Sequence, residues 1–389
     1  MLRCSRVLRI TYLCALFFLC CGFVNDSTIF LTQTPAGVAA QRQALITYIW
    51  GGTLPTRQPT FSVGVSNPIT HSTFTNLASV DQVNMTMDED QRTFGYYFHP
   101  TIRNNRLVIF HHGHDCTMDD GTGSGAPNPY GEGDAVASLV NNHFDVIALF
   151  MIHMNSGDHS HPGLSCGGTP NPHDCIFATQ TNCNDITPNT TYGGSSAHFN
   201  TPVATPTQGT ALQYFLEPVS MVINYILQKR PLYQDISMVG LSGGGWTTHW
   251  IAALYPQIHY LIPIAGSVPL YMRESPHDSD GDTEQNQTAI YTNAGYLDLY
   301  VMGSAGKIGT SNRKMLWTLN SNDNCCFGPA QYGAGWQTAV DNVSSIIATA
   351  LATIGIGGTF TQRTDTVATV HQISSDAITN AILSTLGAP

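Results

Sequence analysis

The chain has 389 residues and a formal net charge of -11, and only 11% of its residues are Asp, Glu, Lys or Arg. That acidic balance, without a block rich in Lys or Arg, excludes a typical nucleic-acid binder, which needs a basic face. The hydrophobic fraction of 42% is large enough for a packed core, so we expect a globular protein.

The N-terminus has the pattern of a secretory signal peptide. Arg3, Arg6 and Arg9 precede the apolar run 10–24, and polar residues follow it. The run is shorter than the roughly 18 to 20 apolar residues that span a bilayer. We therefore predict a signal peptide over 1–24, cleaved near residues 20–25, and an exported protein with no membrane span after cleavage. An uncleaved signal anchor is the alternative.

The cysteines outside this leader indicate disulfides, because an even number in an exported chain is typical of paired thiols. They are Cys116, Cys166, Cys175, Cys183, Cys325 and Cys326. Their connectivity stays open, although the adjacent Cys325 and Cys326 are expected to reach different partners. Asn-x-Ser/Thr sequons at Asn84, Asn189, Asn286 and Asn342 offer glycosylation sites in a eukaryotic host.

The periodicity of the chain predicts a doubly wound α/β fold. A helix is expected over 36–50, and the alternating stretches of 61–100 indicate antiparallel strands. Short continuous apolar runs then favour strands buried in a parallel sheet. These runs are 107–110, 144–152, 236–241, 259–266 and 314–319. Helical patterns occupy 216–230, 244–256, 335–354 and 374–386.

This alternation predicts a mostly parallel, doubly wound sheet with helices on both faces. We expect one domain over 25–389. Irregular insertions at about 155–207 and 271–295 interrupt it, and long loops of this kind in compact domains are usually functional or stapled.

Residues 240–244, G-L-S-G-G, join the predicted strand 236–241 to the helix that follows. In so sharp a turn, small residues two positions before and after Ser242 prevent clashes, and the turn raises the serine hydroxyl above the carboxyl end of the sheet. The adjacent helix N-terminus favours developing negative charge there. A tight turn in which Ser242 only caps the helix is the alternative. A phosphate-binding P-loop is excluded, because no Lys-Ser/Thr pair follows the glycines.

This G-x-S-x-G turn resembles the nucleophile elbow of the α/β-hydrolase superfamily, and the resemblance covers about residues 90–389. It implies a serine nucleophile, an acid and a histidine base in that chain order. His371 is the single histidine after residue 277 and precedes the predicted terminal helix. Asp323 follows the strand 314–319 and is the acid that we favour. The other acids considered are Asp278, Asp280, Asp282, Asp298 and Asp365.

The resemblance also implies an oxyanion hole. Its donors would be the amide of Gly243 and an amide of His114 or Asp115, in the loop after the strand 107–110. His112 and Gly113 of the same loop, and Trp246, are expected to contact substrate.

A tract rich in histidine offers a different interpretation. Eight histidines lie between residues 111 and 173, among Asp115, Asp158 and Asp174. Imidazole and carboxylate groups are metal ligands, but no H-E-x-x-H pattern is present. We expect no metal and no cofactor.

The resulting hypothesis is a secreted serine hydrolase that cleaves a carboxylic ester or related acyl bond of a small or polymer-linked substrate. A serine peptidase of the same fold, or a non-catalytic binding protein with an α/β-hydrolase fold, is the alternative.

Overall fold

The computed structural model describes residues 27–87, 92–113, 131–150, 208–210, 212–228, 233–273, 285, 288–323 and 326–388. The predicted signal peptide and the insertion 155–207 lie outside these ranges, and the insertion 271–295 is described in part. Within the described ranges, no helix is long and apolar enough to cross a membrane.

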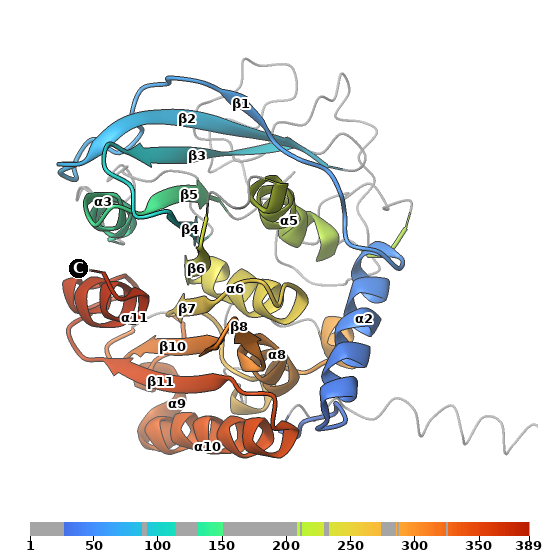
Figure 1. Cartoon of the computed structure of the whole chain (residues 1–389). Helices are drawn as coiled ribbons and strands as arrows, with labels where there is room; N and C mark the ends of the chain where they lie inside the picture. The colour runs from blue at the N-terminus through green and yellow to red at the C-terminus, as the bar shows by residue number, and fades with distance from the viewer. Residues whose placement is uncertain are drawn as a thin grey trace, which may run out of the picture.

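Nine strands of the described chain form one sheet in the order β1-β2-β3-β5-β4-β6-β7-β10-β11 (Figure 1). The strands are β1 (Thr60–Ser62), β2 (Leu77–Thr86), β3 (Arg92–Pro100), β4 (Arg106–His111), β5 (Asp145–Leu149), β6 (Asp235–Leu241), β7 (Tyr260–Ile264), β10 (Lys314–Asn320) and β11 (Thr359–Asp365). Pairings from β1 to β5 are antiparallel, and those from β5 across to β11 are parallel. The predicted mostly parallel sheet is confirmed.

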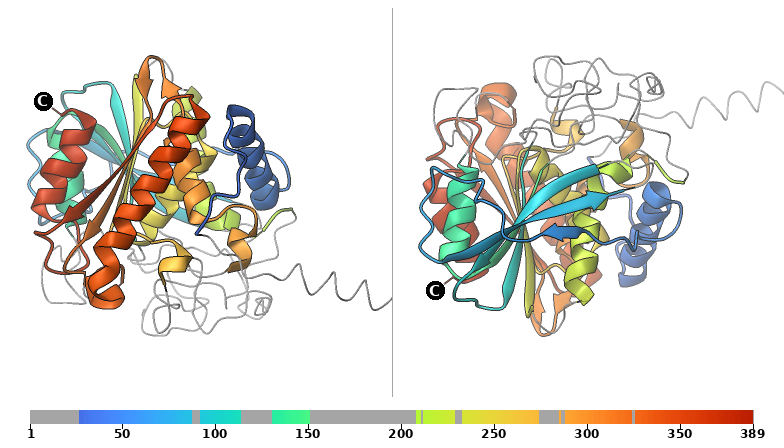
Figure 2. Two further views of the ribbon diagram at one scale, coloured as in Figure 1. Left: turned by 90° about the horizontal axis from the view of Figure 1, so that it is seen from below. Right: turned by 90° about the horizontal axis from the view of Figure 1, so that it is seen from above.

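Helices cover both faces of this sheet (Figure 2). One face packs against α3 (Glu132–Asn141), the π-helix η7 (Ala377–Leu383) and α11 (Ser384–Leu386). The other packs against α2 (Pro35–Trp50), α5 (Leu212–Gln228), α6 (Gly243–Leu254), α8 (Tyr296–Ser304) and α10 (Trp336–Ile354). Shorter elements are η4 (Leu270–Met272), η5 (Thr288–Thr292), the β8–β9 hairpin (Lys307–Ile308 and Ser311–Asn312), α9 (Pro329–Tyr332) and η6 (Gly333–Gly335).

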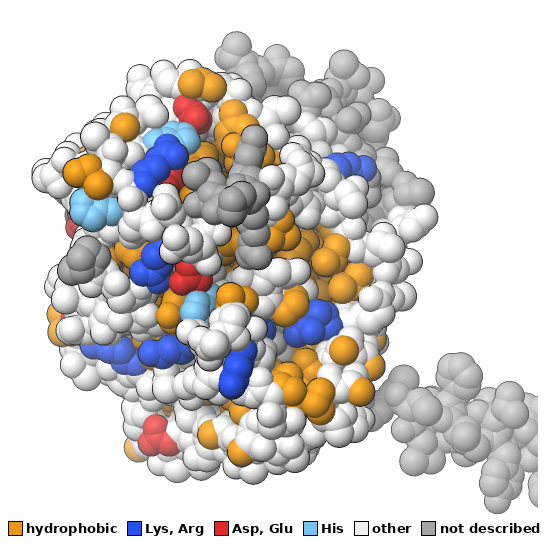
Figure 3. Space-filling model, in the orientation of Figure 1, with side chains coloured by type: hydrophobic (Ala, Val, Ile, Leu, Met, Phe, Trp, Pro, Cys, Tyr) orange, Lys and Arg blue, Asp and Glu red, His pale blue; other side chains and the backbone are white. Residues whose placement is uncertain are grey.

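The five continuous apolar runs correspond to β4, β5, β6, β7 and β10, whose interior residues are buried on both faces. The sequence did not predict β11. This strand lies at the edge of the sheet and reads TFTQRTD, so polar residues hide its β pattern. On the face seen in Figure 3, charged side chains are scattered among uncharged ones.

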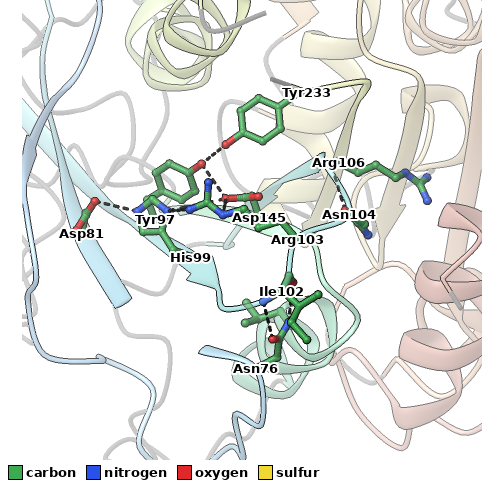
Figure 4. A network of polar contacts seen from close by, with 11 residues as sticks. Asn76, Asp81, Tyr97, His99, Ile102, Arg103, Asn104, Arg106, Asp145 and Tyr233 are labelled. Atoms are coloured by element: carbon green, nitrogen blue, oxygen red, sulfur yellow. Dashed lines mark hydrogen bonds and ion pairs between the residues drawn. The ribbon is translucent and has the colours of Figure 1, made fainter. Parts of the chain in front are cut away.

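A polar network joins the antiparallel strands to the amino-terminal end of the parallel sheet (Figure 4). The Tyr97 hydroxyl donates to Asp145 Oδ1 over 3.0 Å and also contacts the hydroxyl of Tyr233. Arg103 Nη2 lies 3.0 Å from His99 Nδ1, and its Nε lies 3.7 Å from Asp145 Oδ1. Burial raises the pKa of Asp145, and the positive charge of Arg103 opposes that shift. The network therefore fixes the start of β5, at the edge opposite to the carboxyl ends of the parallel strands.

Buried histidines predict a loss of stability in acid. His112 and His249 are fully buried, and burial lowers the pKa of each to about 3. Below the unfolded-state pKa of about 6.5, the unfolded chain takes up protons that the folded chain excludes, so the free energy of unfolding falls as the pH falls. Each such histidine should lower it by about 2 kcal/mol at pH 5.

Urea denaturation at pH 7 and pH 5 tests this sign and magnitude. In His249→Gln the decrease between the two pH values should be smaller than in the wild type by about 2 kcal/mol. Ser345→Ala, on the exposed face of α10, changes no titratable group, so this control should leave the decrease unchanged. An identical pH dependence in His249→Gln and the wild type would contradict the prediction.

Candidate active site

Ser242 lies in a strained turn between β6 and α6. Its backbone has φ 56° and ψ -121°, a conformation that non-glycine residues rarely adopt and that concentrates at functional sites. The Ser242 N–H donates to the carbonyl of Ile264, and the Ser242 carbonyl accepts from Trp246 N–H, both over 3.0 Å. The Ser242 side chain makes no capping hydrogen bond to α6. Ser242 therefore occupies the N-cap position of α6 without capping the helix through its side chain.

The glycines around Ser242 are required by close backbone approach. A β-carbon on Gly240 would lie 2.2 Å from the carbonyl oxygen of Gly244, and one on Gly244 would lie 2.0 Å from that of His111. Neither atom is the end of a flexible side chain, so neither can move aside easily. The G-x-S-x-G pattern is thus explained by the crossing of β6, α6 and the end of β4.

His371 and Asp323 form a hydrogen-bonded pair in which the carboxylate is buried and the imidazole is partly exposed. His371 Nδ1 lies 2.7 Å from Asp323 Oδ2, and Asp323 is fully buried. Its other oxygen, Oδ1, accepts the backbone N–H of Cys326 over 3.0 Å. Because an ionised carboxylate only accepts, it favours the proton on Nδ1 and leaves a lone pair on Nε2. That Nε2 atom is buried and has no hydrogen-bond partner among the described residues.

The loop that carries His371 is held by the side chain of Asn320, which the sequence did not indicate as part of the site. Asn320 Nδ2 donates to the carbonyls of Val370 and Gln372, on either side of His371, over 3.3 and 2.8 Å. Asn320 is the last residue of β10 and is buried. Its position at the end of a predicted strand was the available signal, since the carboxyl ends of parallel strands line one edge of the sheet.

Two of the alternative acids are engaged elsewhere. Asp365 Oδ1 accepts the backbone N–H groups of Val367 and Ala368 over 2.8 and 3.1 Å. Asp298 accepts the N–H groups of Phe30, Leu31 and Gly295 and so fixes the start of α8. The remaining alternatives, Asp278, Asp280 and Asp282, lie outside the described residues.

Ser242, Asp323 and His371 all follow the carboxyl ends of parallel strands. The register pairs Leu241 with Ile264, Ile264 with Thr318, and Asn320 with Asp365 across β6, β7, β10 and β11. Neighbouring strands are about 4.8 Å apart. The three residues therefore lie at the same side of the sheet, beyond the carboxyl ends of the parallel strands. They are within a few strand spacings of one another.

Gly113, two residues after the end of β4, packs against Ser242. A β-carbon on Gly113 would lie 3.0 Å from Ser242 Cβ and 3.6 Å from Ser242 Oγ. Gly243 is the first residue of α6, where backbone N–H groups have no acceptor within the helix. Gly243 and Gly113, the residue before the predicted donors, thus border the serine. His114 and Asp115 lie outside the described residues.

His112 and Trp246 are buried in the interior, so the predicted substrate contacts do not fit their positions. His112 is fully buried and its Nδ1 lies 3.1 Å from Glu132 Oε1. Trp246 is also fully buried, one helical turn after Ser242, and its indole N–H donates to the Tyr291 hydroxyl over 2.7 Å. The sequence showed an aromatic residue near the serine, but its position on α6 directs it toward Tyr291 of η5.

Metal ligation has one geometric candidate among the described residues. Ligand atoms of Asp323, His371 and Cys326 lie within 4.8 Å of one another. Cys326 is disulfide-bonded, so its sulfur is not available as a thiolate ligand, and the remaining two groups already bond each other. Of the histidine-rich tract that is the alternative metal site, His114, His153, His159, His161 and His173 lie outside the described residues.

Comparison with known proteins identifies the fold. No protein-family model matches the sequence, and no curated protein is detectably similar to it. A solved methylesterase is similar with a TM-score of 0.50 and 10% identity, over 91% of this chain and 64% of that one. The acetyl xylan esterase of Thermoanaerobacterium (TM-score 0.46, 12% identity, 92% and 95% covered) also matches. So does the glucuronoyl esterase of Caldicellulosiruptor kristjansonii (TM-score 0.46, 11% identity, 90% and 87% covered). The chain has the α/β-hydrolase fold.

Proposed function

We propose that this protein is a secreted serine hydrolase that cleaves a carboxylic ester through Ser242, His371 and Asp323. One observation carries the proposal. The Asp323–His371 pair, with a buried and unpartnered Nε2, leaves the sheet at the same edge as the strained turn of Ser242. Secretion rests on the predicted signal peptide.

The reaction would proceed by acyl transfer. Ser242 Oγ attacks the ester carbonyl carbon while its proton moves to His371 Nε2, and the carbonyl π electrons move onto the oxygen. Asp323 stabilises the imidazolium that forms and holds the ring through Nδ1. The C–O bond to the leaving alcohol then breaks, His371 returns the proton to that alcohol, and an acyl-enzyme remains. Water repeats the sequence and releases the acid.

The oxyanion would be held by backbone amides. Gly243 N–H lies at the positive end of α6, where the helix dipole favours negative charge. A second amide, from His114 or Asp115, is proposed because the preceding Gly113 already lies against Ser242. Neither the formation nor the hydrolysis of the acyl-enzyme requires a metal or an organic cofactor.

An ester of a small or carbohydrate-linked acyl group is the substrate class that we favour. The methylesterase of the same fold is named for ester cleavage. The insertions at 155–207 and 271–295 would form the rim that selects the substrate.

A fluorophosphonate probe tests this function directly, because its phosphorus forms a bond to an activated serine oxygen as fluoride leaves. We expect the wild-type protein to be labelled at the peptide that contains Ser242 and to hydrolyse p-nitrophenyl acetate. Ser242→Ala should lose both reactions, whereas Ser345→Ala, on the exposed face of α10, should retain both. Absence of labelling in the folded wild-type protein would contradict the proposal.

A further inference from the structure

A second strained turn follows β7 and packs against Ser242. Ala265 and Ser267 have φ values of 43° and 54°, which is unfavourable for residues with a side chain. Gly266 lies between them, and a β-carbon there would be 2.4 Å from the Ser242 carbonyl oxygen and 2.7 Å from Gly245 Cα. The conformation of this turn therefore limits where the Ser242 backbone can lie.

Arg273 holds this turn from within the protein. It is only 4% exposed, and its Nη2 donates to Ser267 Oγ over 2.9 Å and to the Val268 carbonyl over 2.7 Å. Its Nε donates to the same carbonyl, and the Tyr296 hydroxyl of α8 accepts from Nη2 over 2.9 Å. A guanidinium group presents its donors in a rigid fork, so these bonds fix the turn relative to α8.

The same guanidinium faces the Asp323–His371 side of the site. Arg273 Cζ lies 5.5 Å from the ring centre of Phe327, within cation–π range, and the Phe327 and His371 ring centres are 6.5 Å apart. Phe327 directly follows Cys326, whose N–H donates to Asp323. One buried cation thus contacts the turn behind Ser242 and the ring beside His371.

We propose that Arg273 is a positioning residue that keeps Ser242 in register with the Asp323–His371 pair. The inference rests on the proposed function. Arg273 is buried, so it acts through Ser267 and Phe327 rather than by touching substrate. A displacement of about 1 Å between reacting groups lowers a rate by roughly a hundredfold, so a small relaxation of the turn should be measurable.

Arg273→Lys tests this role, because lysine keeps the charge and removes the fork. Turnover of p-nitrophenyl acetate is measured per serine that reacts with the fluorophosphonate at long labelling times. We expect kcat per labelled serine to fall by about tenfold to a hundredfold, with KM changed less than about threefold.

Arg313→Lys is the matched control. Arg313 is equally buried and bonds backbone carbonyls at the carboxyl end of α6, so this variant should melt at a lower temperature with kcat per labelled serine unchanged. A purely structural role for Arg273 predicts the same behaviour, and that result would overturn the inference. If Arg273→Lys does not fold, Ser267→Ala provides a second test, because it removes one of the acceptors that Arg273 bonds. An unchanged kcat in Ser267→Ala would also overturn the inference.

The labelling and turnover measurements distinguish a failure of the proposed function from a failure of the role of Arg273. A folded wild-type protein that is not labelled overturns both proposals. Labelling of the wild type together with equal turnover in Arg273→Lys overturns only the role of Arg273.

Discussion

Asp323→Asn should lower kcat by about ten-thousandfold without unfolding the protein. Both oxygens of Asp323 accept hydrogen bonds, one from Cys326 N–H and one from His371 Nδ1. Asparagine has a single acceptor, and when that oxygen meets Cys326, its amide N–H₂ group faces His371. The ring must then carry its proton on Nε2, where it is unable to accept the proton of Ser242. Steady-state kinetics with p-nitrophenyl acetate measures the loss.

The neighbouring acids supply the controls. In Asp365→Asn the amide oxygen can still accept from Val367 and Ala368 while the amide donates to the Ser374 hydroxyl, so kcat should fall by less than about tenfold. Asp298→Asn should lower stability, because Asp298 accepts three N–H groups, but retain kcat per folded molecule. Retained turnover in Asp323→Asn alongside its loss in Asp365→Asn would refute the assignment.

The sequence predicts those elements of the fold whose amino-acid pattern matches their burial in the structure. Buried parallel strands read as continuous apolar runs, and β6 followed by G-L-S-G-G specifies both the strand and the turn after it. The edge strand β11 lacks such a pattern because most of its residues are only half-buried.

The chain order of serine, acid and histidine was enough to choose Asp323 and His371 as candidates, but not to find the groups that hold them. Asn320 bonds the residues on either side of His371 across 50 and 52 positions of sequence. Arg273 reaches Tyr296 and Phe327 through the interior. Such contacts depend on tertiary packing between distant segments, and they leave no periodic pattern in the sequence near either residue. Trp246 shows the converse, since its proximity in sequence to Ser242 suggested a contact with substrate, whereas its position on α6 buries it.

Arg313→Met should lower the free energy of unfolding by about 4 kcal/mol, because removing a buried group that satisfies several partners leaves those partners unpaired. The Arg313 guanidinium is 1% exposed and donates to the carbonyls of Ile258, Met302, Ala305, Ala252 and Tyr255. Some of these carbonyls lie at the carboxyl ends of α6 and α8. They have no N–H donor within their own helix, and they carry the negative end of the helix dipole.

Urea denaturation at pH 7, followed by tryptophan fluorescence, measures this loss. Lys307→Met removes an exposed cation close to Arg313 in sequence and should change the free energy of unfolding by less than about 0.5 kcal/mol. A change of less than about 1 kcal/mol in Arg313→Met would mean that water satisfies the five carbonyls without the guanidinium. Because α6 is 12 residues long, or about 18 Å, its carboxyl end is remote from Ser242. The folded fraction of Arg313→Met should therefore keep its turnover, which separates the stability of α6 from the positioning of its first residue.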